Sequence, residues 1–98
     1  MIYCMADIHG ERDFFEHMLE QIQFSDTDHL YILGDVIDRG TGGVDMLKRI
    51  MESSNITMLL GNHEQMCLST LGPNNEFGAR DLWKQNGGMT TYQELLYH

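Results

Sequence analysis

Short apolar runs that alternate with stretches of helical periodicity constrain the fold of this chain more than any other feature. The runs cover residues 2–6, 29–33 and 56–60. Each is too short for a helix and lacks strict alternation, as expected of a strand buried on both faces. Between the runs, apolar residues recur at helical spacing: Phe14, Phe15, Met18, Leu19 and Ile22, then Val44, Leu47, Ile50 and Met51. This order predicts an α/β fold, a βαβαβ unit with a parallel sheet and right-handed crossovers.

The last third of the chain is predicted to be helical. Asn62 is placed to cap a helix that runs to about Leu71, where a Gly-Pro-Asn-Asn cluster at residues 72–75 ends it. Residues 81–85 and 90–97 are expected to form shorter helices. No repeat or linker interrupts the sequence, so we expect residues 1–98 to belong to a single domain.

Composition narrows the class of protein. A chain of 98 residues with 42% hydrophobic and 21% charged residues lies in the globular range. Its formal net charge is −9 and its six Lys and Arg residues are scattered. No nucleic acid is therefore expected as a partner, because nucleic-acid binding depends on clustered basic side chains. The sequence shows neither a signal peptide nor a membrane span, and we expect a cytoplasmic protein that does not bind a membrane.

The sulfur-containing residues and two of the histidines are expected to have no part in a site. Cys4 and Cys67 lack CxxC or metal-ligand spacing, so we expect reduced thiols in the core. Methionines are expected to fill the core as well, namely Met46, Met51, Met58 and Met66. His17 lies on the polar side of the first helical stretch and is expected to face solvent, whereas His29 opens the second strand.

Each apolar run ends in a polar cluster that contains glycine. The clusters are Asp7-Ile8-His9-Gly10, Gly34-Asp35-Val36-Ile37-Asp38-Arg39-Gly40 and Gly61-Asn62-His63-Glu64. The carboxyl ends of parallel strands meet at one edge of an open α/β sheet, and ligands bind there. We therefore expect the clusters to form one site.

The clusters contain typical ligands of a divalent transition metal, namely Asp7, His9, Asp35 and Asn62. Carboxylate, imidazole and amide groups together suit Mn, Fe or Zn better than Ca or a thiolate-binding metal. Asp7 and His9 lie two residues apart on an extended segment and can bind one ion. Asp35 can bridge to a second ion, with Asn62 on its far side. Two ions about 3.5 to 4 Å apart form a clamp for in-line displacement at phosphorus.

The remaining polar residues of the clusters are candidates for catalysis and substrate binding. His63 follows a candidate ligand and is placed to protonate a leaving alkoxide, and Asp38 is a candidate to hold its ring. Arg39 offers a planar fork for two phosphate oxygens. We expect Arg39, Asn62 and His63 to contact the substrate.

Each cluster taken alone has a structural alternative. Asp7 could cap the first helix, Asn62 and Gln65 could be a capping pair, and Asp38 with Arg39 could form a solvated turn. The pattern Gly-Asp-x-x-Asp-Arg-Gly, however, is expected by chance in roughly one chain of this length in ten thousand. Its occurrence between the other clusters, each closing a strand, favours a functional site.

The clusters resemble the first signature motifs of the PPP-type serine/threonine phosphatases, within the calcineurin-like metallophosphoesterases. The stretch from Trp83 to Gly88, followed by Thr90-Thr91-Tyr92, is similar to the Trp…Asn-Gly-Gly…Thr segment of the bacterial and phage branch. This resemblance implies the βαβαβ portion of an α/β/β/α sandwich with two divalent ions. It implies the following roles: Asp7 and His9 bind the first ion, Asp35 bridges, Asn62 binds the second, His63 is the general acid, and Asp38 and Arg39 orient that acid and bind phosphate.

The resemblance also implies that further ligands follow this stretch of sequence. Members of that family supply two more histidine ligands and another arginine from later loops, so the chain resembles the N-terminal part of such a domain, truncated after the third metal-site motif. We expect the chain to bind at most one Mn-like ion. We also expect its unpaired sheet edge and apolar helix faces to favour self-association.

The expected activity is that of a metal-dependent phosphomonoester hydrolase of the phosphoprotein phosphatase type. It would use a dinuclear site and a metal-activated hydroxide on a phosphoprotein or a phosphorylated small molecule. One alternative is symmetrical hydrolysis of dinucleoside polyphosphates by the same motifs. Another is a fragment that binds metal or phosphate without catalysis.

Overall fold

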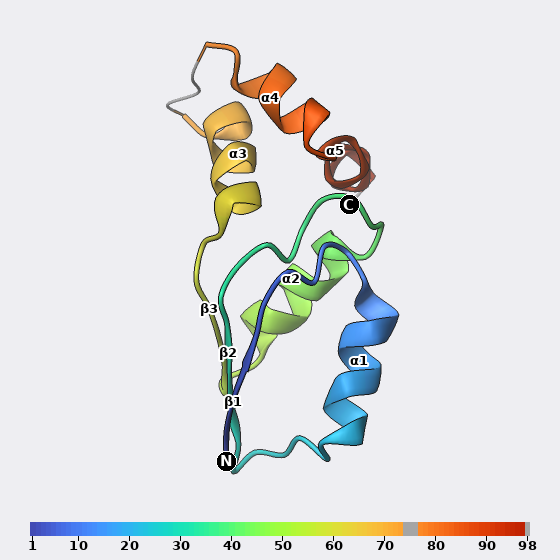
Figure 1. Cartoon of the computed structure of the whole chain (residues 1–98), viewed down its shortest axis with the longest axis vertical. Helices are drawn as coiled ribbons and strands as arrows, with labels where there is room; N and C mark the ends of the chain where they lie inside the picture. Colours follow the sequence, from blue (N-terminus) through green and yellow to red (C-terminus); the bar gives the residue numbers. More distant parts are fainter. Residues whose placement is uncertain (74–76, 98) are drawn as a thin grey trace.

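The computed structural model describes residues 1–73 and 77–97, which form a parallel sheet followed by helices (Figure 1). The strands are β1 (Ile2–Met5), β2 (His29–Ile32) and β3 (Ile56–Met58), in the order β1-β2-β3. The helices are α1 (Arg12–Gln21), α2 (Gly43–Glu52), α3 (Asn62–Leu71), α4 (Ala79–Gln85) and α5 (Met89–Leu96). The predicted βαβαβ unit is confirmed, with each strand slightly shorter than its apolar run. Asn74 and Asn75 of the predicted helix stop lie outside the described residues.

Helices α1 and α2 cover the same face of the sheet (Figure 1). The chain crosses from β1 to β2 and then from β2 to β3, in one direction across the sheet. Right-handed crossovers that run in one direction place their helices on one side. The buried core lies on that side and consists of Ile8, Phe15, Leu19, Leu30, Ile32, Val36, Met46, Ile50 and Ile56.

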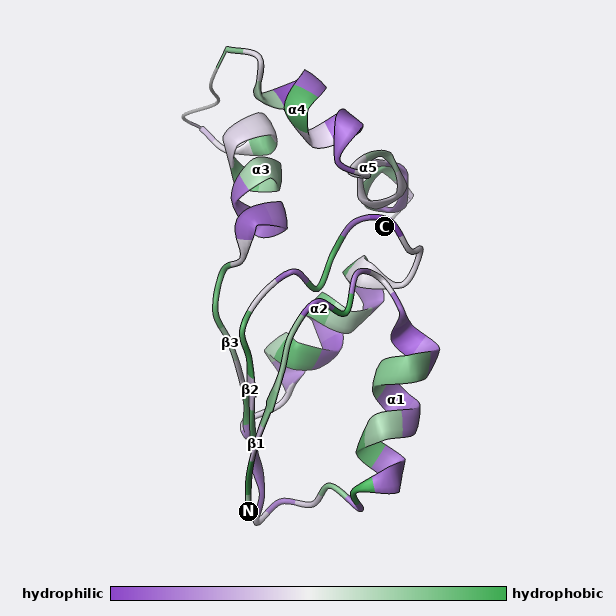
Figure 2. Cartoon of the chain, viewed as in Figure 1, coloured by the Kyte–Doolittle hydropathy of each residue, from purple (hydrophilic) through white to green (hydrophobic). Residues whose placement is uncertain are grey.

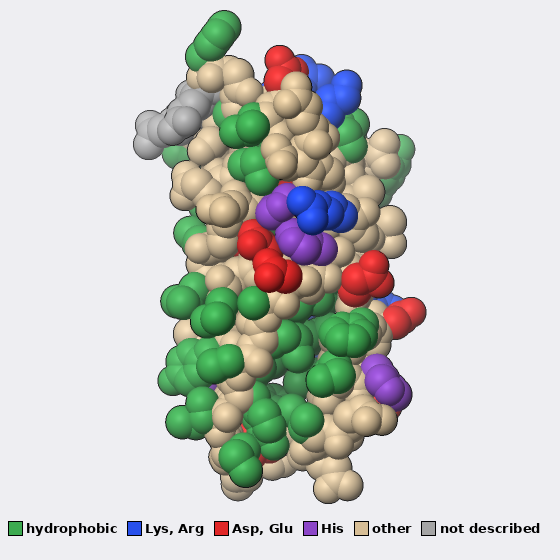
Figure 3. All heavy atoms as spheres, in the orientation of Figure 1, with side chains coloured by type: hydrophobic (Ala, Val, Ile, Leu, Met, Phe, Trp, Pro, Cys, Tyr) green, Lys and Arg blue, Asp and Glu red, His purple; other side chains and the backbone are tan. Residues whose placement is uncertain are grey.

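The opposite face of the sheet is exposed in the described part of the chain, so the prediction that both faces are buried is wrong there. Ile2 is 71% exposed and Tyr31 is 40% exposed. Cys4 pairs with Tyr31 in the β1–β2 register and is exposed beside it, which corrects its expected place in the core. The strands read as continuous apolar runs because apolar residues also occupy this second face, which no described helix covers. Figure 3 shows hydrophobic side chains gathered over the strand half of the molecule.

Two residues of the helical stripes also differ from the prediction. Phe14 is 57% exposed and Met51 is 84% exposed, whereas Met46 is completely buried. The face of α2 that meets the sheet carries Met46 and Ile50, which are four residues apart, and Met51 lies a further 100° around the helix. Hydrophobic and hydrophilic segments alternate along both helices, as expected of amphipathic helices (Figure 2).

The other residues that were expected to lie outside the site behave largely as predicted. His17 is exposed and His29 opens β2. Cys67 is only partly buried, and this burial raises the pKa of its thiol to about 11. No helix within residues 1–73 and 77–97 combines the length and the apolar character that a membrane crossing requires.

A glycine turn after β2 brings the second and third clusters together. Gly34 has a φ of +109°, and a Cβ atom built on it would lie 2.4 Å from the backbone nitrogen of Gly61. Both its backbone conformation and its contact with Gly61 therefore exclude a side chain. Gly78 has a comparable φ of +80° but no atom within 4 Å of an added Cβ.

We predict that Gly34→Ala lowers the free energy of unfolding by more than about 2 kcal/mol, because it adds a backbone clash to the strain of a positive φ. Gly78→Ala is the matched control, since it adds the strain without the clash. Urea unfolding followed by circular dichroism measures both changes. Equal losses in the two variants would show that the close approach of Gly34 to Gly61 is not a packing constraint.

Candidate active site

The structure brings the three clusters together at the carboxyl end of the sheet. Backbone hydrogen bonds join the first cluster to the second: the His9 N–H donates to the Asp35 carbonyl at 3.0 Å, and the Gly10 N–H donates to the Val36 carbonyl at 2.7 Å. The Gly40 N–H in turn donates to the His9 carbonyl at 3.0 Å. In Figure 3, histidine, carboxylate and basic side chains gather at mid-height, between the apolar strand half and the helices α3 to α5.

Asp7, His9 and Asp35 form a group that fits a divalent metal. Each offers a ligand atom, and these atoms all lie within 4.8 Å of one another. The His9 Nδ1 lies 3.1 Å from the Ile37 carbonyl oxygen, which can only accept a hydrogen bond. Nδ1 therefore carries the proton, and Nε2 is left as a metal ligand, 4.0 Å from the Asp7 carboxylate.

Asn62 lies next to this group, at the first position of α3. Its two chain neighbours both contact Asp35. The His63 N–H donates to the Asp35 Oδ1 at 2.9 Å, and a Cβ atom on Gly61 would lie 2.6 Å from the backbone nitrogen of Asp35. The side chain of Asn62 is exposed at this edge of the sheet.

The backbone is strained where the candidate ligands lie. Among the described residues, positive φ values outside glycine occur at Asp7, His9, Gln23, Asp35, Asp38 and Arg39, between 47° and 76°. All except Gln23 are candidate site residues. A left-handed conformation is uncommon for residues with a Cβ, and such strain concentrates at functional sites because the surroundings hold it in place.

His63 and Asp38 form a buried pair beside the candidate metal ligands. The His63 Nδ1 lies 2.8 Å from the Asp38 Oδ2, and Asp38 has no exposed surface. Asp38 is therefore not part of a solvated turn. The rings of His9 and His63 meet edge to face with their centroids 4.5 Å apart, which places the candidate acid next to a candidate ligand.

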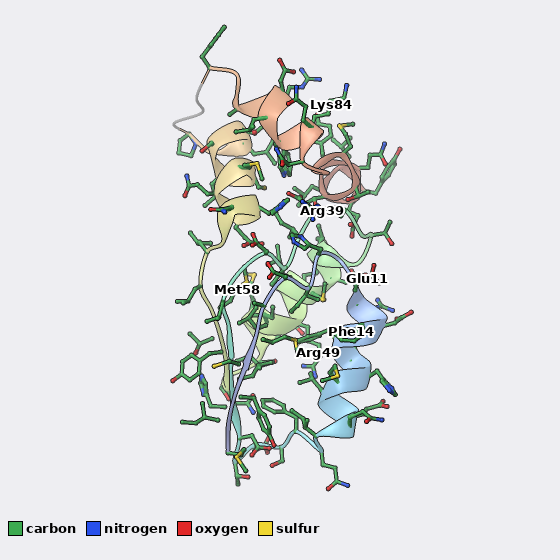
Figure 4. The ribbon with its side chains drawn as sticks, in the orientation of Figure 1. Glu11, Phe14, Arg39, Arg49, Met58 and Lys84 are labelled. Atoms are coloured by element: carbon green, nitrogen blue, oxygen red, sulfur yellow. The ribbon has the colours of Figure 1, made fainter. Side chains whose placement is uncertain are left out.

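Arg39 is exposed, and its position is set by the backbone. Its N–H donates to the Gly87 carbonyl at 2.9 Å. Figure 4 shows Arg39 between the end of the sheet and the helices α4 and α5. The guanidinium group thus lies at the same edge as the histidines and is free to meet an anionic group.

The capping alternatives for Asp7 and Asn62 do not describe this structure. Helix α1 begins after Glu11, four residues beyond Asp7. Helix α3 has Gly61 at its N-cap position, and Asn62 is its first helical residue. Gln65 donates instead to the Ser69 hydroxyl at 3.2 Å. Neither Asp7 nor Asn62 is therefore needed to begin a helix.

Glu64 is a structural residue of the site that sequence analysis missed. It is 4% exposed. Its Oε1 accepts the N–H groups of Asp35 at 2.6 Å and Gly61 at 2.8 Å. Its Oε2 accepts the N–H groups of Val36 at 2.8 Å and Ile37 at 3.3 Å. The signal was its place three residues after the N-cap, where a glutamate closes a capping box. One buried carboxylate thus binds the second cluster to the third.

Comparison with known proteins shows the family of this chain. The family model for calcineurin-like phosphoesterases matches residues 1–96, and the chain belongs to this family, whose members use divalent metals. The class defined by the fold and the ligand group is therefore that of a metal-dependent phosphoesterase domain.

Curated relatives carry a narrower name. The chain is 43% identical over 65 residues to a symmetrical bis(5'-nucleosyl)-tetraphosphatase of Acidovorax sp. (strain JS42). This match covers 64% of the chain and 23% of that protein. It is 38% identical over 64 residues to the protein of the same name from Salmonella paratyphi B, covering 63% of this chain and 23% of the relative. The match thus spans about a quarter of the length of these relatives.

We predict that Glu64→Gln lowers the free energy of unfolding by about 3 kcal/mol, because an amide nitrogen would replace an oxygen that faces backbone N–H groups. Glu16→Gln is the control. Glu16 pairs with Arg49, but both side chains are about 40% exposed. Loss of this ion pair should therefore lower the free energy of unfolding by less than about 1 kcal/mol. Thermal unfolding of the two variants measures the difference. Similar losses would mean that Glu64 does not hold the two clusters together.

Proposed function

We propose that the native full-length protein cleaves dinucleoside polyphosphates symmetrically, with the help of two divalent metal ions. The observation that carries this proposal is the ligand group of Asp7, His9 and Asp35 at the carboxyl end of the sheet. The relatives named symmetrical bis(5'-nucleosyl)-tetraphosphatases support the choice of substrate.

The residues of this chain divide between metal binding and handling of the substrate. Asp7, His9 and Asp35 would bind one ion, and Asp35 and Asn62 would supply some of the ligands of the second. Mn suits this mixture of oxygen and nitrogen ligands, and Fe or Zn would also be accepted. When bound, the ions supply Lewis acidity at phosphorus and lower the pKa of the attacking water.

Arg39 and His63 act on the substrate itself. The Arg39 guanidinium binds two oxygens of a phosphate through its planar fork. Asp38 holds the Nδ1 side of His63, so that Nε2 is the ring atom that gives a proton to the leaving oxygen. In cleavage at the centre of a tetraphosphate, that oxygen belongs to a nucleoside diphosphate.

Hydrolysis of phosphoproteins is the second candidate, and the His63–Asp38 pair favours it. A serine or threonine alkoxide is a poor leaving group and depends strongly on a general acid, whereas a nucleoside diphosphate leaves as a stable anion. The PPP-type motifs are compatible with both reactions. Substrate assays therefore have to separate them.

We expect the native full-length protein with Mn to convert diadenosine tetraphosphate into ADP alone, with a higher kcat/KM than it has for a phosphoserine peptide. Chromatography of the nucleotide products measures this. Release of AMP and ATP would contradict symmetrical cleavage. A higher kcat/KM on the phosphopeptide would favour the second candidate.

We predict that His63→Asn lowers kcat on a phosphoserine peptide by about a hundredfold or more, because the alkoxide then leaves without a proton. The loss should be smaller on p-nitrophenyl phosphate and on diadenosine tetraphosphate, whose leaving groups are better. Steady-state kinetics on the three substrates give the comparison. Equal losses on all of them would remove His63 from the role of general acid.

We further predict that the 98-residue chain binds at most one Mn ion, and weakly. Asp7, His9 and Asp35 supply three ligands to one ion, but the second receives only Asp35 and Asn62, and tight sites generally need three or four ligands. In titration calorimetry, Asp7→Asn should weaken binding at least about tenfold. Asp26→Asn, at an exposed acid outside the clusters, should leave it unchanged. Two tight sites per chain would contradict this ligand count.

A further inference from the structure

Two side chains outside the three clusters contact the buried carboxylate of Asp38. The Trp83 Nε1–H, from α4, donates to the Asp38 Oδ2 at 2.8 Å. The Thr91 hydroxyl, from α5, donates to the Asp38 Oδ1 at 2.7 Å. Trp83 is 2% exposed and Thr91 is 1% exposed, so water does not compete for these contacts. Both oxygens of Asp38 are thus bound from the side opposite the sheet.

The directions of these hydrogen bonds are fixed by chemistry. An indole nitrogen can only donate, so the Asp38 Oδ2 accepts from Trp83 and faces the His63 Nδ1 as well. The Thr91 hydroxyl also accepts the Asp38 backbone N–H at 2.9 Å, which leaves its own proton for the Asp38 Oδ1. Thr91 therefore joins the backbone and the side chain of Asp38 and limits rotation of that side chain.

The turn between α4 and α5 fits the Asp38–Arg39 segment closely. A Cβ atom on Gly87 would lie 2.7 Å from the Arg39 Cγ, and one on Gly88 would lie 2.4 Å from the Trp83 ring. The φ of Asp38 is 76°, a conformation that its surroundings must hold. Helices α4 and α5 thus pack against the Asp38–Arg39 segment, and Asp38 is the residue that pairs with His63.

We propose that Trp83 and Thr91 are positioning residues for the reaction: they lock Asp38 in the orientation that accepts the His63 Nδ1–H and leaves Nε2 toward the substrate. An aspartate held by His63 alone could rotate, and the histidine could then adopt its other tautomer. This proposal rests on the proposed role of His63 as the general acid. The structural part of the proposal is that these residues control the His63 tautomer, and it can be tested without an activity assay.

The first test is nuclear magnetic resonance of the 15N-labelled chain at about pH 8.5, above the ordinary pKa of histidine. The unsubstituted chain should show His63 with its proton on Nδ1, and a Trp83 indole proton protected from exchange. The indole signal is assigned by its loss in Trp83→Phe and should move in Asp38→Asn. An Nε2-protonated His63 in the unsubstituted chain would overturn the proposal before any variant is made.

Thr91→Val and Thr91→Ser form the matched pair of variants. Valine keeps the shape of threonine and removes the hydroxyl, whereas serine keeps the hydroxyl. Thr91→Val and Trp83→Phe should each give a mixture of His63 tautomers, and Thr91→Ser should retain the Nδ1-protonated form. A retained tautomer in folded Thr91→Val and Trp83→Phe would overturn the proposal. Circular dichroism establishes that each variant is folded.

The second test uses kinetics of the native full-length protein. Thr91→Val should lower kcat on a phosphoserine peptide by about tenfold and on p-nitrophenyl phosphate much less, because it acts through the acid. Thr91→Ser should retain most of the activity. Thr91→Val should lower kcat no further when it is combined with His63→Asn. Equal losses on both substrates would mean a structural role only. If His63→Asn itself shows no dependence on the leaving group, the proposed role of His63 as the general acid fails, while the tautomer result still decides whether Trp83 and Thr91 position Asp38.

Discussion

The loop of residues 34–40 after β2 is the part of the molecule on which the candidate site depends. Its strand lies between β1 and β3, so the loop meets the ends of both neighbours. The first cluster binds it through backbone hydrogen bonds at His9 and Gly10. Glu64 binds it from the third cluster. The α4–α5 unit holds its far end. Asp35 lies in this loop, and His9 and His63 both contact it.

These contacts stabilise a conformation that the loop would not adopt alone. The positive φ values of Asp35, Asp38 and Arg39 each cost on the order of 1–3 kcal/mol. Hydrogen bonds to a buried carboxylate contribute about 1.5–3 kcal/mol each and offset that cost. Glu64 and Asp38 use their carboxylates for opposite tasks. Glu64 accepts backbone N–H groups and shapes the loop, whereas Asp38 accepts side-chain donors and aligns a histidine.

Much of this arrangement could be predicted because it depends on local pattern. Apolar runs closed by polar clusters identified the strands, their parallel order and the edge where Asp7, His9 and Asp35 meet. The exposed face of the sheet could not be predicted in this way, because an apolar strand residue looks the same whether or not a partner layer covers it. Met51 was misplaced for a related reason, since a small change of helix phase exchanges buried and exposed positions.

The contacts that support the site were harder to predict because they join residues distant in sequence. Thr91 and Asp38 are 53 positions apart, and their contact depends on how the α4–α5 turn packs. Periodicity does not encode such a distance. Trp83 was identified within a motif, but only the fold shows that its indole meets a buried carboxylate.

Asp7, His9 and Asp35 are proposed to form a metal centre that the loop after β2 aligns. Anomalous diffraction from crystals of the native full-length protein grown with Mn would locate the ion. We expect a Mn peak bound by the Asp7 and Asp35 carboxylates and by the Nε2 atom of His9, with the His9 Nδ1 still donating to the Ile37 carbonyl. A peak bound elsewhere, or coordination through the Nδ1 atom of His9, would contradict it.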